Sequence, residues 1–297
     1  MAVSQRVYKQ RIRSTQTLKK MFRAMELIAA SRIGKARDLA TKASPYTRAL
    51  TRATSAVAAH AQASHPLLTE RTDTNRVAVL VLTADRGMAG AYTATVLRAA
   101  EKLFEQLAEE GKEVDLYVVG RRGIGYYTFR DRHLVRTWEG QSDKPDAALA
   151  REIADAAVET FLAPAEEGGV SELHIVFTKF ESMVSQVPLV RRMLPLEIVE
   201  GVSEPGAKPL PLYEFEPSAD AVLDQLLPLY IRSRVYNALL QAAASELASR
   251  QRAMHTAVEN ADELIGNYTR LANTARQAEI TQELTEIVSG ADALAAS

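Results

Sequence analysis

The distribution of proline is the feature that most constrains the fold of this chain. Proline interrupts helices, and here it is confined to the middle of the sequence. None of the 11 prolines precedes Pro45, and none follows Pro228. Proline has no backbone N–H donor and its ring clashes with the preceding turn, so it disfavours a helix interior. Two long stretches, one at each end of the chain, are therefore free to form continuous helices.

Apolar residues recur at helical spacing in both of these stretches. In the first, steps of three or four residues join Leu18, Phe22, Met25, Ala29, Ile33, Ala36, Ala40, Ala43, Tyr46, Leu50, Ala53 and Val57. In the last, the same steps join Leu247, Arg250, Met254, Ala257, Ala261, Leu264, Tyr268, Leu271, Ala275 and Ala278. A repeat of about 3.5 residues is the period of a coiled coil. We therefore expect the two helices to pair with each other, and their similar lengths favour an antiparallel pair.

The middle of the chain has a different period. Apolar runs typical of buried strands occur at residues 77–82, 114–119 and 173–177, whereas residues 90–110 and 146–162 have helical periodicity. Strands that alternate with helices predict a mostly parallel sheet covered by helices on both faces. The predicted fold class is therefore α/β with a long antiparallel coiled coil: a Rossmann-like, mostly parallel sheet domain between two long terminal helices.

This pattern divides the chain into three parts. Residues 1–60 form an N-terminal coiled-coil helix, residues 61–215 form the α/β domain with its linkers, and residues 216–297 form a C-terminal coiled-coil helix with a tip. Residues 204–217 contain four prolines and are expected to be an extended linker. The longest aliphatic run, residues 77–82, is far shorter than the roughly 20 residues of a membrane span, so we expect no membrane insertion.

The net charge of −1 conceals a strongly basic N-terminal segment. Residues 1–60 contain 13 Lys or Arg and only two acids, Glu26 and Asp38. A mitochondrial transit peptide is also basic, but the periodic pattern continues past the length of a presequence. An ordinary solvated face would mix both signs of charge. A nucleic-acid arm usually comes with a recognisable module or with aromatic stacking residues, so an acidic protein partner ranks above nucleic acid.

The sequence contains no recognisable catalytic, metal-binding or cofactor-binding motif. The chain has no cysteine, and none of its five histidines has a second histidine at helical metal-pair spacing. The glycine-containing loops at residues 85–90 and 120–125 match neither dinucleotide-binding nor P-loop spacing and are interpreted as ordinary βα turns. His174 lies within a predicted strand and is interpreted as a satisfied core residue. We therefore predict no cofactor, no metal and no enzymatic activity of the chain alone; an NAD-dependent enzyme and a nucleic-acid-binding protein stay as alternatives.

Four blocks of sequence carry a resemblance to a known family. They are KMFRAMELIAASR at 20–32, TADRGMAG at 83–90, SQVPLVRRMLPL at 185–196 and ARQAEITQELTEIVSG at 275–290. With these blocks the chain resembles, over essentially its whole length, the gamma subunit of a bacterial F-type ATP synthase. That family often has GLCGG after the DR of the second block. Here the turn reads GMAGA, and without cysteine a thiol switch of the chloroplast kind is excluded.

The resemblance implies a central rotary shaft that has no catalytic residues. In that family the terminal helices stand inside a ring of three alpha and three beta subunits, and the middle domain lies with the epsilon subunit on the membrane rotor (c) ring. Proton-driven rotation of the shaft cycles the catalytic beta subunits through different states. The implied location is peripheral, on the cytoplasmic face of the bacterial plasma membrane, with no nucleic acid among the partners.

The resemblance also implies roles for individual residues. The expected contacts with beta subunits are Arg23, Met25, Arg32, Arg86, Arg276, Gln277, Thr281, Gln282 and Glu283. The expected contacts with the rotor ring are Tyr213 and Glu216. The expected apolar bearing of the shaft consists of Ile280, Leu284, Ile287 and Val288.

The end of the chain has an apolar stripe that this pairing cannot cover. If Val57 lies opposite about Val222, the numbers of paired residues add to about 279, and Ala2 lies opposite about Gln277. Everything after Gln277 then has no partner helix within the chain. We therefore predict that the stripe beginning at Ile280 packs against another molecule.

Overall fold

The computed structural model describes residues 5–60, 65–196, 216 and 218–295. It divides into two compact units, one of residues 30–250 and one of residues 1–29 together with 251–297. The two longest helices, α1 (Gln5–His60) and α5 (Ala219–Ala295), contribute residues to both units. The predicted linker at residues 204–217 lies almost wholly outside the described residues.

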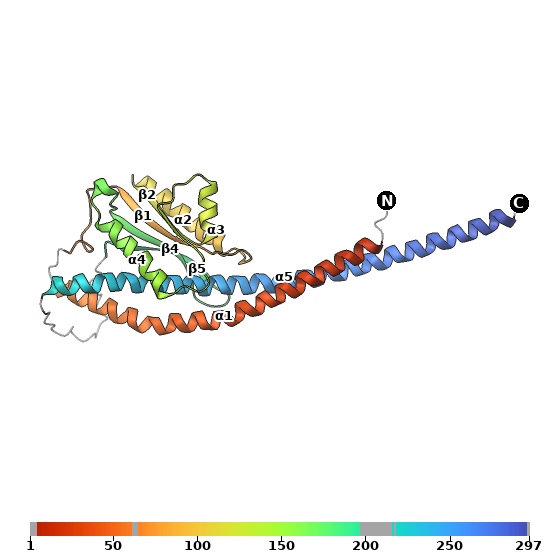
Figure 1. Ribbon diagram of the computed structural model, residues 1–297, viewed down its shortest axis with the longest axis horizontal. Coiled ribbons are helices and arrows are strands. Elements are labelled where there is room, and N and C mark those ends of the chain that lie inside the picture. The colour runs from red at the N-terminus through yellow and green to blue at the C-terminus, as the bar shows by residue number, and fades with distance from the viewer. Residues whose placement is uncertain (1–4, 61–64, 197–215, 217, 296–297) are drawn as a thin grey trace, which may run out of the picture. The chain divides into compact units, whose positions relative to one another are not determined.

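The first unit is built around a five-stranded sheet in the order β3-β2-β1-β4-β5 (Figure 1). The strands are β1 (Arg76–Leu82), β2 (Glu113–Val119), β3 (Arg136–Trp138), β4 (Glu172–Phe180) and β5 (Gln186–Leu194). All neighbouring strands run parallel except β4 and β5, which are antiparallel. The prediction of a mostly parallel sheet between terminal helices is confirmed.

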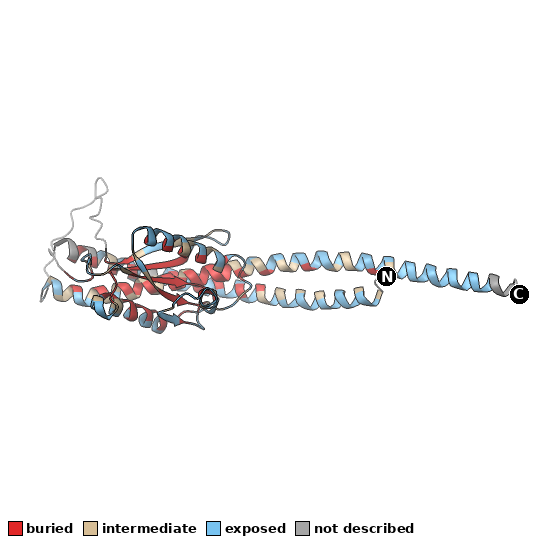
Figure 2. Cartoon of the chain, turned by 90° about the horizontal axis from the view of Figure 1, so that it is seen from above, coloured by how far each residue is buried: buried red, intermediate tan, exposed pale blue. Residues whose placement is uncertain are grey.

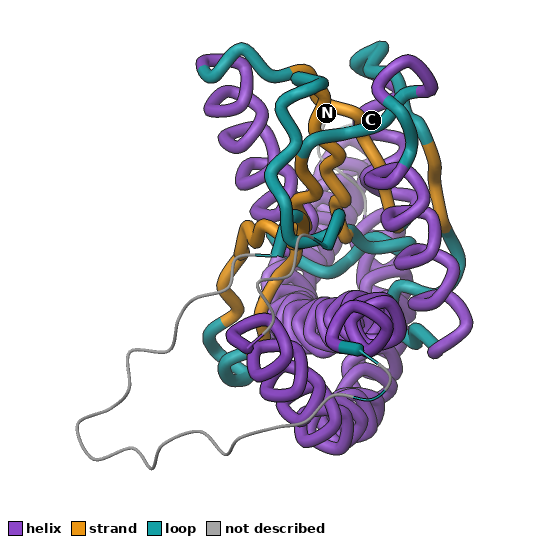
Figure 3. Tube along the Cα trace, turned by 90° about the vertical axis from the view of Figure 1, so that its left-hand side faces the viewer, coloured by secondary structure: helices purple, strands orange, loops and turns teal. Residues whose placement is uncertain are grey.

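Helices cover both faces of this sheet. They are α2 (Tyr92–Glu109), α3 (Arg121–Phe129) and α4 (Ala147–Leu162), and a short 3-10 turn, η1 (Ala165–Glu167), follows α4. Because side chains alternate along a strand, Val77, Val79 and Val81 of β1 pack with α2 and α3. The alternate residues Ala78, Leu80 and Leu82 pack in a second core with α4 and α5. Figure 3 looks along α1 and α5 and shows the strands to one side of them.

Three of these elements were not predicted as such. Helix α3 was interpreted as a βα turn, and strands β3 and β5 were not assigned. The loop before α3 is indeed a βα turn: Gly120 has φ 97°, and a Cβ there would lie 2.4 Å from the carbonyl oxygen of Thr83. Asp146 caps α4 through the backbone N–H of Leu149, at 2.8 Å, which explains the sharp start of that helix.

Both long helices run through a proline, as the predicted helical ranges 1–60 and 216–297 require. Pro45 lies inside α1 and Pro228 inside α5. Each proline removes one backbone hydrogen bond, to the carbonyl four residues earlier. Those carbonyls belong to Thr41 and Asp224, which are exposed, so water can donate the missing hydrogen bond.

The apolar stripe of α1 is confirmed in the sheet-containing unit, with one exception. Ile33 and Ala36 form a small core with Ala244, Leu247 and Ala248 of α5. Tyr46, predicted to lie on this stripe, is exposed. Thr47 is buried in its place, and its hydroxyl lies 2.7 Å from that of Ser233 on α5.

In the smaller unit, α1 and α5 pair in the predicted antiparallel sense. Lys19 contacts Asp262 at 2.5 Å, whereas Glu26, farther along α1, contacts His255, which lies earlier in α5, at 3.0 Å. The residue numbers of each pair add to 281, whereas the predicted register gives about 279, so the register differs by two residues. The packing is thin, as expected from small seam residues: Leu18, Leu264 and Leu271, all predicted to lie on the seam, are exposed, while Ala261 and Ala272 are buried.

Candidate partner-binding surfaces

The C-terminal part of α5 is an unpaired helix with an exposed apolar stripe. We call residues 276–295 the tip segment; every residue from Arg276 to Ala291 is exposed (Figure 2). Its apolar side chains have exposed fractions of 45% at Ile280, 58% at Leu284, 67% at Ile287 and 59% at Val288. The prediction that this stripe has no partner within the chain is confirmed for the described residues.

The tip segment begins opposite the first described residues of α1. Gln5, the first described residue of α1, donates its backbone N–H to Oε1 of Glu279 at 3.3 Å. The predicted end of the pairing, Gln277, lies two residues from this contact. Beyond it the hydrogen bonds are within α5, such as Thr281 Oγ1 to the carbonyl of Gln277 at 2.9 Å and Gln282 Nε2 to Glu286 at 2.9 Å.

The polar residues predicted to contact a partner near the tip lie on successive turns of this single helix. They are Arg276, Gln277, Thr281, Gln282 and Glu283, and all are exposed. Neither the Arg276 guanidinium nor the Gln277 amide makes a side-chain hydrogen bond to another described residue. Both groups can therefore bind a partner without first breaking an internal contact.

In α1 of the smaller unit, the structure adds a residue that the sequence did not single out. Arg23 is exposed and Met25 half-buried, but Glu26 beside them is buried. Nη1 of Arg23 donates to Oε2 of Glu26 at 2.8 Å, and Nδ1 of His255 lies 3.0 Å from Oε1. Burial alone would raise the pKa of Glu26, but the hydrogen bonds and charges of Arg23 and His255 outweigh it, so the pKa is lowered. The sequence signal was available, since a carboxylate beside the seam residues of a basic helix needs a partner.

Two further predicted contacts, Arg32 and Arg86, lie in the sheet-containing unit and differ in availability. Nη1 of Arg32 is paired with Asp143 Oδ2 at 2.5 Å. Arg86 is exposed and makes no ion pair with any described residue. Of the two, Arg86 is therefore the arginine free to meet an acidic partner.

The turn that carries Arg86 is held from both sides. The Asp85 carboxylate accepts the backbone N–H groups of Arg121 at 3.1 Å and Ser142 at 2.8 Å. Burial would raise the pKa of Asp85, but backbone hydrogen bonds from Gly140, Ser142 and Arg121 lower it below its usual value. Nη2 of Arg250 in α5 donates to the Arg86 carbonyl at 3.3 Å, so the turn is fixed to the long helix.

Arg250 is itself one half of a buried ion pair. Its Nη2 lies 2.6 Å from Oε1 of Glu246, one helical turn earlier, and both side chains are buried. Burial raises the pKa of Glu246, and the charge of Arg250 offsets only part of that rise. Arg250 was predicted as a seam position; the structure explains its burial by this pair and by its contact with the turn.

Of the two predicted rotor-ring contacts, one lies among the described residues. Tyr213 lies outside the described residues, and Glu216 is described and exposed.

His174 is buried as predicted, with Nε2 2.7 Å from Glu172, but its Nδ1 has no partner among the described residues. Within the described ranges no cluster of three potential metal ligands occurs. No helix in these ranges is long and apolar enough to cross a membrane.

Comparison with known proteins assigns a family to this architecture. A family model described as ATP synthase matches residues 4–294. The chain is 72% identical over 297 residues to the ATP synthase gamma chain of Beutenbergia cavernae, covering 100% of both chains. It is 56% identical to the ATP synthase gamma chain of Acidothermus cellulolyticus, covering 100% of this chain and 99% of the other.

Solved structures show the same fold at low identity. A chain of the Euglena gracilis mitochondrial ATP synthase (OSCP/F1/c-ring, rotational state 3) matches 98% of this chain and 94% of its own length, with a TM-score of 0.66 and 15% identity. A chain from the central stalk and c-ring of the Tetrahymena thermophila mitochondrial ATP synthase matches 80% of this chain and 99% of its own, with a TM-score of 0.58 and 20% identity.

Proposed function

Because the chain belongs to the ATP synthase gamma-chain family, we propose that it is the central rotary shaft of a bacterial F-type ATP synthase. It has no catalytic residues of its own. Its partners are the alpha and beta subunits of the catalytic ring, the epsilon subunit and the membrane c ring. It works on the cytoplasmic face of the plasma membrane as a peripheral subunit.

The observation that carries this proposal is the exposed tip segment. Leaving an apolar stripe of a single helix exposed to water is unfavourable, so such a stripe marks a surface that a partner covers. A ring of subunits around the axis would bury Ile280, Leu284, Ile287 and Val288 on all sides, which suits a helix that turns. At about 25 cal/mol per Å² of apolar surface, burying four such side chains would contribute several kcal/mol to assembly.

The mechanism follows from asymmetry. A single off-axis helix inside a three-fold ring contacts each beta subunit differently, so each subunit is held in a different conformation. Rotation exchanges these contacts in turn, and the nucleotide sites change affinity without bond chemistry by the shaft. We assign Arg276, Gln277, Thr281, Gln282 and Glu283 to contacts around the tip.

The predicted beta-subunit contacts outside the tip segment are assigned by charge attraction. Arg23, Met25 and Arg86 are assigned to acidic loops of the beta subunits, and Arg32 to the same surface once its bond to Asp143 is exchanged. Glu216 and Tyr213 are assigned to the rotor ring. Residues 1–60 and 216–297 then form the shaft, and residues 61–215 its base.

Reconstitution tests the proposal. The chain is mixed with purified alpha and beta subunits, and we expect a stoichiometric 3:3:1 complex with ATPase activity. Without such a complex the proposal fails. In R276A/Q277A we expect weaker assembly or torque coupling with an unchanged melting temperature. The matched control is E263A/N273A, which removes exposed polar side chains elsewhere on α5. Unchanged coupling in a correctly folded R276A/Q277A chain would contradict the assigned roles.

A further inference from the structure

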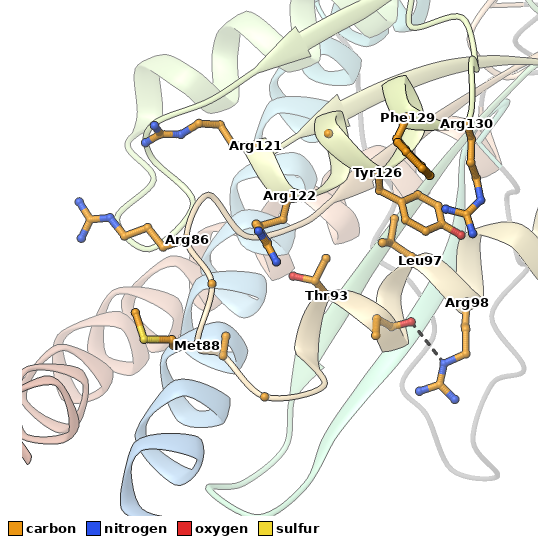
Figure 4. A pocket seen from close by; sticks show the side chains of 15 residues that line it. Arg86, Met88, Thr93, Leu97, Arg98, Arg121, Arg122, Tyr126, Phe129 and Arg130 are labelled. Atoms are coloured by element: carbon orange, nitrogen blue, oxygen red, sulfur yellow. Dashed lines mark hydrogen bonds between the residues drawn. The ribbon is translucent and has the colours of Figure 1, made fainter. Parts of the chain in front are cut away.

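A groove of about 640 Å³ lies at the carboxyl ends of β1 and β2 in the sheet-containing unit (Figure 4). Its walls are the turn after β1, the first turns of α2, and α3. The carboxyl edge of parallel strands is where open α/β sheets usually bind ligands. The sequence indicated no ligand here.

The groove is lined by arginine without any acidic residue. The five arginines are Arg86, Arg98, Arg121, Arg122 and Arg130. Only Arg121 lies within ion-pair distance of carboxylates, at 3.8 Å from Asp85 and 3.9 Å from Glu139. The other four form no ion pair with any described residue. Like charges gathered without counter-charges repel one another, so an anionic partner would relieve this repulsion.

Apolar groups accompany these charges. Phe129 has an exposed fraction of 89% and Met88 one of 50%, and both line the groove. The guanidinium of Arg130 lies over the Tyr126 ring, 3.8 Å from its centroid. In Figure 4, Arg122 extends toward Thr93, and Arg98 and Arg130 lie on the side of Tyr126 and Phe129. Arg86 and Arg121 extend away from Arg98 and Arg130.

These apolar groups and the local backbone favour a peptide over a phosphate. The backbone N–H groups that begin α3 are already used: Arg121 donates to Asp85, Arg122 to the Ala84 carbonyl and Gly123 to the Thr83 hydroxyl. These three N–H groups at the start of α3 are therefore not free to form the amide cradle that phosphates use at helix starts. A phosphate would also leave Phe129 uncovered.

We propose that this groove binds an acidic segment of another subunit in the assembled synthase. Carboxylates of that segment pair with Arg98, Arg122 and Arg130, and one of its apolar side chains packs on Phe129 and Tyr126. The proposal rests on the proposed function, because it needs the complex. It adds Arg98, Arg122 and Arg130 to the contact assigned to Arg86, which lines the same groove but extends away from Arg98 and Arg130.

Photo-crosslinking in the purified complex tests the occupant. Phe129 is replaced by benzoylphenylalanine in the full chain, and Val184 likewise in a control, since Val184 is also highly exposed but does not line the groove. We expect position 129 to crosslink to a segment rich in Asp and Glu, and position 184 not to reach that segment. No crosslink at position 129, or one to a segment without carboxylates, would overturn the proposal.

Affinity measurements with the crosslinked subunit separate charge from apolar contact. Phe129→Ala and the triple variant R98Q/R122Q/R130Q should each weaken its binding at least about tenfold, whereas Val184→Ala should not. Full affinity in both groove variants would refute the proposal. So would competition by inorganic pyrophosphate together with full affinity of Phe129→Ala, because the groove would then be a simple anion site. If the proposed function itself is wrong, the unmodified chain forms no complex, and this outcome is distinguishable from both of the results above.

Discussion

The two ends of α5 have the same kind of apolar spacing and opposite surroundings. Near its start, Leu223, Leu227 and Ile231 lie four residues apart and have exposed fractions of 0%. In the tip segment, Leu284 and Val288 have the same spacing and are more than half exposed. Apolar periodicity therefore predicts that a helix face packs against a neighbour, but it does not predict whether that neighbour belongs to the same chain. Near the start of α5 the neighbours belong to the same chain.

The largest effect should come from a buried charge in the part of α5 that belongs to the sheet-containing unit. In Arg250→Ala, Glu246 loses the guanidinium 2.6 Å away and stays buried. Removing one partner of a buried ion pair costs about 3–5 kcal/mol. We expect that loss in the free energy of unfolding, measured by urea denaturation. Because Arg250 also holds the Arg86 turn, the variant should loosen that turn, which hydrogen exchange would detect.

The control for this prediction lies in the other part of the helix. Arg270→Ala removes an exposed arginine whose side chain bonds, among the described residues, to Asn267 on its own helix, so we expect a change within about 0.5 kcal/mol. Equal losses in Arg250→Ala and Arg270→Ala would mean that burial does not distinguish these positions.

A matched pair of leucines measures the apolar difference directly. Leu227→Ala removes a fully buried side chain and should cost about 2–5 kcal/mol, since a cavity remains. Leu284→Ala makes the same chemical change at an exposed position and should alter the stability of the isolated chain by less than about 0.5 kcal/mol. Chemical denaturation of both variants checks this. A clear loss in Leu284→Ala would show that the tip packs within the chain.

This contrast explains which parts of the fold could be predicted from the sequence. Strand β1 was predicted because each residue from Val77 to Leu82 faces one of two cores, which produces a continuous apolar run. The exposed tip was predicted because pairing in register leaves α1 too short to cover it. Both inferences need only spacing and length, which the sequence contains.

The missed features depend on contacts between distant residues. Helix α3 contains Gly123 and Gly125, which oppose a helix in isolation, but a Cβ at Gly123 would lie 2.6 Å from the Thr83 hydroxyl. Strand β5 contains Pro188, which a sheet tolerates because β5 is an edge strand. The groove arginines come from α2, α3 and the turn after β1, so only the fold brings them together.

The buried hydroxyl pair in the sheet-containing unit should have a smaller effect. Thr47→Val keeps the shape of the side chain but leaves the Ser233 hydroxyl without its 2.7 Å partner. An unsatisfied buried hydroxyl costs about 1–3 kcal/mol. Adding Ser233→Ala should recover part of that loss, which a double-mutant cycle would measure. In the tip segment, Thr281→Val should have almost no effect, because its hydroxyl bonds only within its own exposed helix. Strict additivity of the Thr47 and Ser233 changes would remove the argument for pairing.

The smallest effect should be a pH dependence confined to the sheet-containing unit. Burial lowers the pKa of His174; the hydrogen bond and charge of Glu172 act in the opposite direction, and the charges of Arg192 and Lys112 add to the lowering. The folded state therefore favours the neutral imidazole more than the unfolded chain does. The resulting stability is fully present above the unfolded value of 6.5 and is lost as pH falls from there toward the lowered folded pKa. Urea midpoints at pH values on either side of 6.5 should thus differ in the original chain and differ less in His174→Gln. His133→Gln, at an exposed position, should leave the difference unchanged, and an equal pH response in His174→Gln and the original chain would assign the effect to other groups.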